Sequence, residues 1–173
     1  MNNLYTKTLL YAYPKLNAVI KQIDEVIDKI LFSSMDNYRP CMAQCEKIIA
    51  YRLRKERVKI LIKKMDKVIS KLQDEELVHL DYKFFKSKKK EEFKDLDTTS
   101  RAYFRKQVAI VNKVSELLEK VGLNDEVFKR DYLSMKFFRY ILGRVIEVES
   151  FTKKYTGEGK RHRYVRKTAR IVA

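Results

Sequence analysis

Residues 58–72 read VKILIKKMDKVISKL, and the spacing of the apolar residues in this stretch decides the fold class. Val58, Leu61, Met65, Val68 and Leu72 follow one another at alternating steps of three and four residues. Such steps place side chains on one side of an α-helix, and lysines fill half of the positions between them. The stretch therefore predicts a long amphipathic helix with an apolar seam that packs against another helix.

A second amphipathic helix precedes this one. Its apolar residues also recur at steps of three and four and are Leu16, Val19, Ile20, Ile23, Val26, Ile27, Ile30 and Leu31. Residues 33–37 have the composition of a loop, and Pro40 suits the first turn of the next helix. Further upstream, Pro14 ends or kinks the apolar segment Leu4–Tyr13. We therefore expect an antiparallel helical hairpin within residues 1–73.

The composition favours an all-α fold. Only four glycines and two prolines interrupt the chain, and 45% of its residues are hydrophobic, which is enough to build a core. No run approaches the roughly 18 apolar residues that a membrane span needs. The first residues lack the basic region and cleavage site of a signal peptide. We expect a cytoplasmic protein with no membrane contact.

A helix-turn-helix is predicted for residues 74–122. Glu75–Phe85 forms a first helix, Lys89–Leu96 a short second helix with Phe93 among its apolar anchors, and residues from about 100 to 121 a longer third helix. In a helix-turn-helix the last of these enters the major groove of DNA, and its first residues meet the edges of the bases.

The residues at the start of the third helix suit DNA. Thr98, Thr99 and Ser100 carry hydroxyls that cap a helix or bind phosphate, and Arg101 and Arg105 come next, followed by Lys106. Arginine binds guanine through two parallel hydrogen bonds. No acidic residue occurs between positions 98 and 115. These residue types predict a DNA-binding surface.

The central region also resembles a known family. The stretches DEEL (74–77), LDYKFF (80–85) and TSRAYFRK (99–106) are similar to the promoter-reading region of the sigma-factor-like regulators of phages and mobile elements in low-GC Gram-positive bacteria, the ArpU and RinA type. The resemblance covers roughly a quarter to a third of the chain. It implies a transcriptional regulator of late phage genes.

The resemblance also implies roles for particular residues. Thr99 would be the N-cap of the recognition helix, and Tyr103 would pack inward. The residues that would face or flank DNA are Ser100, Arg101, Phe104, Arg105 and Lys106. The hairpin would then contact RNA polymerase or a second copy of the chain.

Beyond Gly122, which suits the end of the third helix, a C-terminal helical segment is predicted for residues 123–156. Asn124 is the expected cap of its first helix, and residues 137–146 supply an apolar face. A basic flexible tail is predicted for residues 157–173. Its cations include Lys160, Arg161, Arg163, Arg166 and Lys167.

The net charge of +16 makes a nucleic acid the expected partner. Residues 73–122 carry only +1 of this charge, whereas residues 1–72 carry +8 and residues 153–173 carry +7. We expect auxiliary phosphate contacts from the tail and from Lys59, Lys63, Lys67 and Lys71 of the long helix. A solvated face of an amphipathic helix is the other explanation of these four lysines.

No catalytic, metal-binding or cofactor-binding motif is present, so we expect neither an enzyme nor a bound metal or cofactor. Cys41 and Cys45 are interpreted as reduced structural thiols that pack like small apolar residues. Double-stranded DNA is the expected partner, and sequence-specific transcriptional regulation is the predicted function. The alternative is a helical interaction protein that binds RNA or a protein partner, with the basic tail as an electrostatic tether.

Overall fold

The computed structural model describes residues 1–36, 41–86, 93 and 100–156, although the side chains of 33–36, 41 and 151–156 are not part of that description. The described segments are helical and contain no β-strand, so the predicted all-α fold is confirmed. The elements are α1 (Asn3–Ala12), the 3₁₀ turn η1 (Tyr13–Lys15), α2 (Leu16–Asp36), α3 (Cys41–Ile69), α4 (Asp74–Leu80), the π-helical turn η2 (Asp81–Phe85), α5 (Arg101–Lys120), α6 (Asp125–Asp131) and α7 (Lys136–Thr156).

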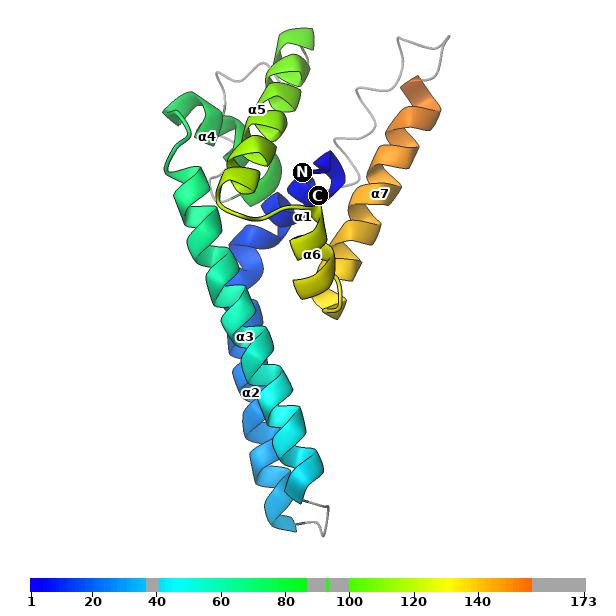
Figure 1. Cartoon of the computed structure of the whole chain (residues 1–173). Coiled ribbons are helices and arrows are strands. Elements are labelled where there is room, and N and C mark those ends of the chain that lie inside the picture. The colour runs from blue at the N-terminus through cyan, green and yellow to red at the C-terminus, as the bar shows by residue number, and fades with distance from the viewer. Residues whose placement is uncertain (37–40, 87–92, 94–99, 157–173) are drawn as a thin grey trace.

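Helices α2 and α3 form the predicted antiparallel hairpin, which extends away from the other helices (Figure 1). The seam predicted from residues 58–72 is buried along its whole length. An ion pair of 2.6 Å between Lys55 of α3 and Asp24 of α2 joins the two helices further along the hairpin. Pro14 lies in η1, where the chain turns from α1 into α2, and this confirms the predicted break.

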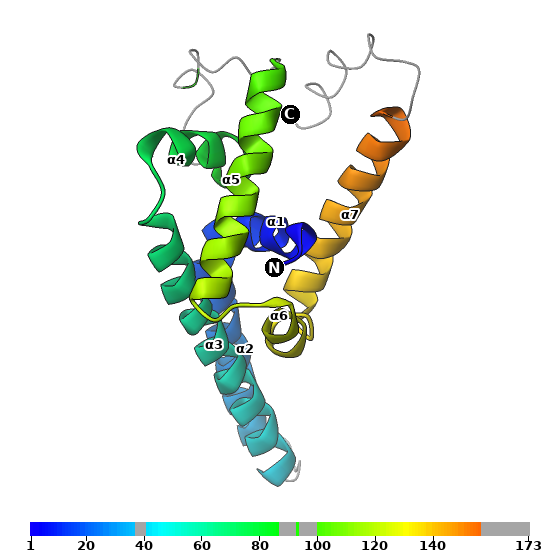
Figure 2. The ribbon, with the colours of Figure 1, turned by 45° about the horizontal axis from the view of Figure 1, so that its top comes forward.

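Helix α1 is the centre of the remaining structure, and it packs against both α5 and α7 (Figure 2). Leu9 and Leu10 are almost fully buried, and so are the two threonines of the same helix. The hydroxyl of Thr8 donates a hydrogen bond of 2.7 Å to the carbonyl of Leu4, which satisfies that buried polar group within the helix. Helix α1 therefore lies between α5 and α7 and holds both through its buried side chains.

One hydrophobic cluster includes residues from every helix of the structure. Phe128 of α6 and Phe138 of α7 are fully buried, and their rings meet nearly at right angles with 6.1 Å between the centroids. Tyr5 of α1 contacts Phe128 from the other side, with 4.8 Å between the ring centroids. This aromatic group fixes α6 and α7 against the first helix of the chain.

The turn between α5 and α6 follows its predicted signals. Gly122 has a φ of +73°, and the N–H of Leu123 donates to the carbonyl of Leu118 over 2.9 Å, which is the Schellman arrangement. The side chain of Asn124 accepts a hydrogen bond of 2.9 Å from the N–H of Val127 and caps α6. Gly122 and Asn124 therefore act as the sequence predicts.

The first half of α3 is more exposed than the sequence predicts. Ile49 follows Cys41 and Cys45 at the four-residue spacing of one helix face, yet its side chain is 57% exposed. Cys45 is exposed and forms no disulfide, so its interpretation as a buried thiol is wrong. The reason is that α2 covers one side of α3 here and that no third helix among the described residues packs on the rest. No described helix is long and apolar enough to span a membrane.

Candidate nucleic-acid interface

Helix α4 and the turn η2 support the start of α5. A capping box between Gln73 and Glu76 begins α4. In it the N–H of Gln73 donates a hydrogen bond of 2.9 Å to the Glu76 carboxylate. The π-helical turn η2 ends at Lys86, whose φ of +53° is left-handed. Leu80 and Phe84 are buried and attach this segment to the core.

The predicted second helix of the helix-turn-helix, Lys89–Leu96, lies outside the described residues except for Phe93. The ring of Phe93 is buried and meets Tyr82 edge to face, with 5.4 Å between the ring centroids. Phe93 is therefore an apolar anchor, as its place in the sequence predicts.

Ser100 is the N-cap of α5. Its hydroxyl accepts a hydrogen bond of 3.1 Å from the N–H of Tyr103, and its backbone is extended, with a φ of −73° and a ψ of 147°. The prediction of Thr99 as the cap is therefore wrong by one residue. Several neighbouring side chains in this stretch suit a cap, so the sequence alone does not determine which of them occupies it.

The inner face of α5 rests on an aromatic and polar cluster. The ring of Tyr103 stacks on His79 with 5.2 Å between the centroids and meets Tyr82 at a right angle. The amide nitrogen of Gln107 donates to the carbonyl of His79 over 3.0 Å and to the Tyr103 hydroxyl over 3.2 Å. Tyr103 therefore packs inward as predicted, and this fixes the rotation of α5.

The environment of this cluster favours uncharged groups. Burial raises the pKa of Tyr103 to about 12, and the neighbouring Tyr82 contributes to the same change. Burial also lowers the pKa of His79, and the positive charge of Lys106 adds to that shift. Both rings are consequently neutral at physiological pH, as their stacked contact in a buried place requires.

The outer face of α5 carries the predicted reading residues. Arg101 and Arg105 are exposed, and neither forms an ion pair with another described residue. Phe104 is 51% exposed and Val108 is 58% exposed on the same face. These side chains are separated by steps of three and four residues, so they form one continuous strip along the first turns of the helix.

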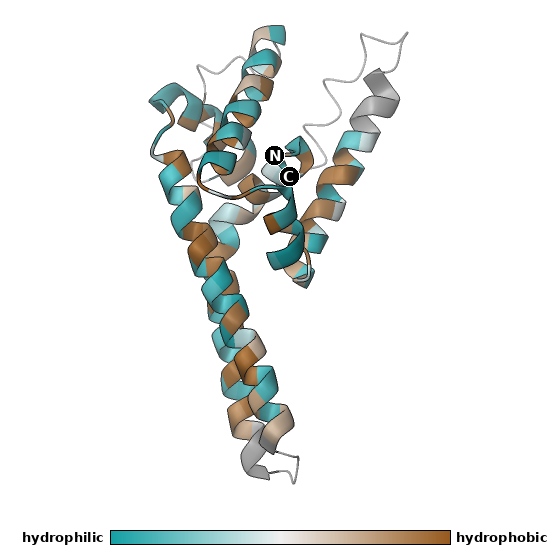
Figure 3. Cartoon of the chain, in the orientation of Figure 1, coloured by the Kyte–Doolittle hydropathy of each residue, from teal (hydrophilic) through white to brown (hydrophobic). Residues whose placement is uncertain are grey.

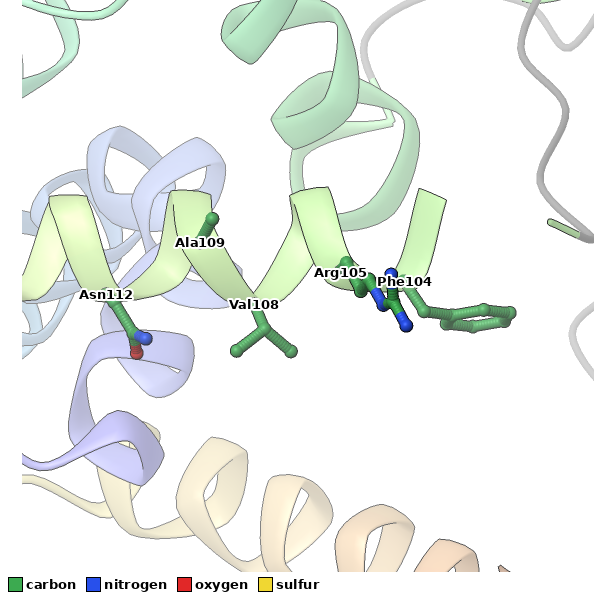
Figure 4. Close-up of a pocket in the computed structure, with 5 residues that line it drawn as sticks. All are labelled: Phe104, Arg105, Val108, Ala109 and Asn112. Carbon is green, nitrogen blue, oxygen red and sulfur yellow. The ribbon is translucent and has the colours of Figure 1, made fainter. Parts of the chain in front are cut away.

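A shallow hollow of about 440 Å³ follows this strip, and it is lined by Phe104, Arg105, Val108, Ala109 and Asn112. Figure 4 shows Phe104, Val108 and Asn112 projecting from α5 on the side where α7 runs. The amide oxygen of Asn112 accepts a hydrogen bond of 3.1 Å from Asn3 of α1. Val108, Ala109 and Asn112 were not among the predicted site residues, although their helical spacing continues the strip.

Lys106 points to a different partner. Its ammonium group lies 2.6 Å from the carboxylate of Glu75 in α4, and this contact holds the pKa of Glu75 below its usual range. Lys113, two turns further on, pairs with Glu76 at 2.7 Å. The two lysines therefore bind α5 to α4, and the cations that remain available on the outer face are Arg101 and Arg105.

The four lysines predicted as auxiliary contacts on the long helix differ in their surroundings. Lys59 pairs with Glu56 at 2.7 Å on the surface of α3. Lys63, Lys67 and Lys71 are exposed. They lie on the last turns of α3 and just beyond it, next to the part of the molecule that holds α5.

Several predicted site residues lie outside the described residues. They are Thr98 and Thr99 before α5, and Lys160, Arg161, Arg163, Arg166 and Lys167 in the predicted tail. No group of three or more His, Cys, Asp or Glu side chains that could hold a metal ion occurs in the described part of the chain.

Comparison with protein-family models, with curated proteins and with solved structures gave no match to this chain.

Proposed function

We propose that this protein is a sequence-specific DNA-binding transcriptional regulator of the cytoplasm, and that α5 is its recognition helix. The observation that supports this most strongly is the contrast between the two faces of α5. Tyr103 and Gln107 hold the inner face on α4, whereas Arg101 and Arg105 project from the outer face without an ion-pair partner among the described residues. A recognition helix needs both properties, a fixed rotation and free donors.

The strip also has the right chemistry for reading base edges. Each exposed arginine has the forked donors that match O6 and N7 of guanine. Phe104 and Val108 offer apolar surface of the kind that contacts the methyl group of thymine. We therefore expect a preferred site that contains guanine and thymine at neighbouring positions.

The remaining cations would supply affinity that does not depend on sequence. Lys63, Lys67 and Lys71 would contact phosphates, as would the basic residues of positions 157–173. Each phosphate contact releases counterions, so the affinity should fall as salt rises. The similarity to sigma-like phage regulators adds a contact with RNA polymerase to this proposal.

Selection from a random duplex library tests the proposal. The full-length chain is immobilised, bound duplexes are recovered over several rounds, and the pool is sequenced. We expect a short enriched motif that contains guanine. A pool that stays random after selection would contradict sequence-specific binding, whatever the total affinity.

A second candidate function is binding of a protein partner through the same strip, and the hollow beside Phe104 and Val108 favours it. An apolar concavity on a helix is suited to the apolar side chains of another protein. Under this function Phe104→Asp would abolish capture of the partner, and Arg101→Ala would have little effect. Under DNA reading the arginine variant has the larger effect.

A further inference from the structure

The outer surface of α3 carries a row of exposed apolar residues that the proposed DNA contact does not use. Met42 is 75% exposed, Ile49 and Leu53 are each 57% exposed, and Ile60 is 49% exposed. At 100° per residue these four side chains lie within about 20° of one line along the helix. We call them the α3 outer stripe.

The α3 outer stripe faces away from α2. Lys55 forms its ion pair with Asp24 of α2, and Ile48 and Tyr51, half-buried like Lys55, lie on the same side of α3, followed by the fully buried Val58. They occur on the opposite side of the helical wheel from the stripe. Helix α3 is thus apolar on two opposite faces, and α2 covers only one of them. Figure 3 shows hydrophobic residues, in brown, recurring along both helices of the hairpin.

The spacing of the stripe is symmetrical about its midpoint. The steps between its four residues are seven, four and seven, so the order is the same when the helix is read backwards. If two copies of α3 lie antiparallel about a twofold axis at position 51, Met42 faces Ile60 and Ile49 faces Leu53. Every apolar residue of the stripe then meets an apolar residue of the other copy.

We propose that the α3 outer stripe is the interface with a second copy of this chain, in an antiparallel arrangement. The four helices of the two hairpins then lie in one row, with the two α3 helices in contact at its centre and the two α2 helices outside. The stripe spans 18 residues, or roughly 27 Å at 1.5 Å per residue, which is about five turns of contact. The proposal does not depend on the DNA contact of α5.

The charges beside the stripe agree with this pairing. Glu46 and Arg57 lie on the same flank of α3 and are both exposed. In the antiparallel arrangement the twofold axis brings each Glu46 next to Arg57 of the partner subunit, and two such pairs of opposite charge result. Because the flanks carry acidic as well as basic residues, they suit this pairing better than a nucleic acid.

Sedimentation velocity of the full-length chain over a wide range of concentrations tests the proposal. The buffer should contain enough salt to screen the net charge of +16, which opposes association. We expect a reversible dimer. Ile49→Glu and Leu53→Glu should each raise the dimer dissociation constant by about a hundredfold or more, because each buries an unpaired carboxylate in the interface.

Ile146→Glu is the matched control, since Ile146 is a 45% exposed apolar residue on α7, away from the stripe. It should leave the dimer unchanged, and the circular dichroism of all three variants should match that of the wild type. A wild-type chain that stays monomeric throughout would overturn the proposal. So would a dimer that survives Ile49→Glu.

Cross-linking tests the antiparallel register. In a chain with Cys41→Ser and Cys45→Ser, Ile49→Cys and Leu53→Cys are made as two separate proteins of different mass and then mixed under mild oxidation. We expect the mixed disulfide to form faster than either symmetrical disulfide. Preferential formation of the symmetrical products would indicate a parallel pairing and overturn the arrangement.

Discussion

The two halves of α3 contain the same kinds of residue but have very different surroundings. From Met42 to Arg57 no residue of α3 is fully buried, whereas Val58, Leu61, Met65 and Val68 in the second half have no measurable exposure. The first half packs mainly against α2, and at its end the carbonyl of Arg57 accepts a hydrogen bond of 3.2 Å from the Tyr132 hydroxyl. The second half also packs directly against α5. The number of packed neighbours, and not the apolar content, therefore decides burial along this helix.

We call the first half of α3, residues 42–57, together with residues 28–32 of α2, the distal arm, and the remaining described residues the body. A pair of helices in contact along one face buries little surface, and an isolated helix is only marginally stable in water. Most of the folding free energy should therefore come from the body. The distal arm is the part of the molecule that gains most from a partner.

The largest expected effect contrasts a body residue with an arm residue. Phe138→Ala removes a fully buried ring and should lower the free energy of unfolding by about 3–5 kcal/mol. Leu53→Ala truncates a side chain that is 57% exposed, and it should change that free energy by less than about 1 kcal/mol in the monomer. Urea unfolding followed by circular dichroism measures both. Equal losses would show that the body and the arm are not distinct in stability.

The second contrast uses two adjacent aromatic residues of α5. Tyr103 is 7% exposed and Phe104 is 51% exposed. Tyr103→Ala should lower the free energy of unfolding by about 3 kcal/mol, because it removes the contacts with His79 and Tyr82. Phe104→Ala should change it by about 0.5 kcal/mol or less. The same urea titrations measure both variants. A larger loss of unfolding free energy for Phe104→Ala than for Tyr103→Ala would contradict the burial of the Tyr103 face of α5.

The third contrast uses two glycines. Gly122 has a φ of +73°, a backbone conformation that residues with a side chain rarely adopt. Gly143 lies within α7, and a Cβ added there would meet nothing within 4 Å. Gly122→Ala should cost about 1 kcal/mol. Gly143→Ala should stabilise the protein by up to about 1 kcal/mol through better helix propensity. Thermal melts of the two variants should shift in opposite directions.

The smallest expected effect concerns pH. Since the pKa of His79 is lowered in the folded state from its usual value of 6.5, the unfolded chain binds this proton more tightly. The contribution of the neutral ring to stability is therefore present above pH 6.5 and is lost as the pH falls below that value. His79→Gln should flatten this part of the stability curve between pH 7 and pH 5. An identical slope in the variant would exclude His79 as the source.

Local patterns in the sequence predicted much of the fold. The seam of residues 58–72, the break at Pro14, and the helix signals at Gly122 and Asn124 depend on nearby residues and on backbone geometry, so they could be identified without tertiary information. The exposure of Ile49 and Cys45 could not, because it depends on which helices pack around the arm. The apolar steps of α3 look alike on both of its faces.

The candidate site was predictable to a similar extent. The resemblance to sigma-like regulators implied the inward position of Tyr103 and the outward positions of Arg101, Phe104 and Arg105, whereas helical spacing alone does not distinguish Tyr103 from Phe104. The pairing of Lys106 with Glu75 does not, because 31 residues separate them in the chain and only the packing of α4 on α5 brings them together.

The measurement that tests the central claim most directly compares specificity with salt dependence. Dissociation constants for a selected duplex and a scrambled duplex are determined at several salt concentrations for three proteins: the wild type, Arg101→Ala/Arg105→Ala, and Lys63→Ala/Lys67→Ala/Lys71→Ala. The arginine variant should lose most of the preference for the selected duplex, about 1–3 kcal/mol per arginine. The lysine variant should keep the preference and lose about three units of the salt slope. A preference that survives removal of both arginines would contradict the assignment of α5 as the recognition helix.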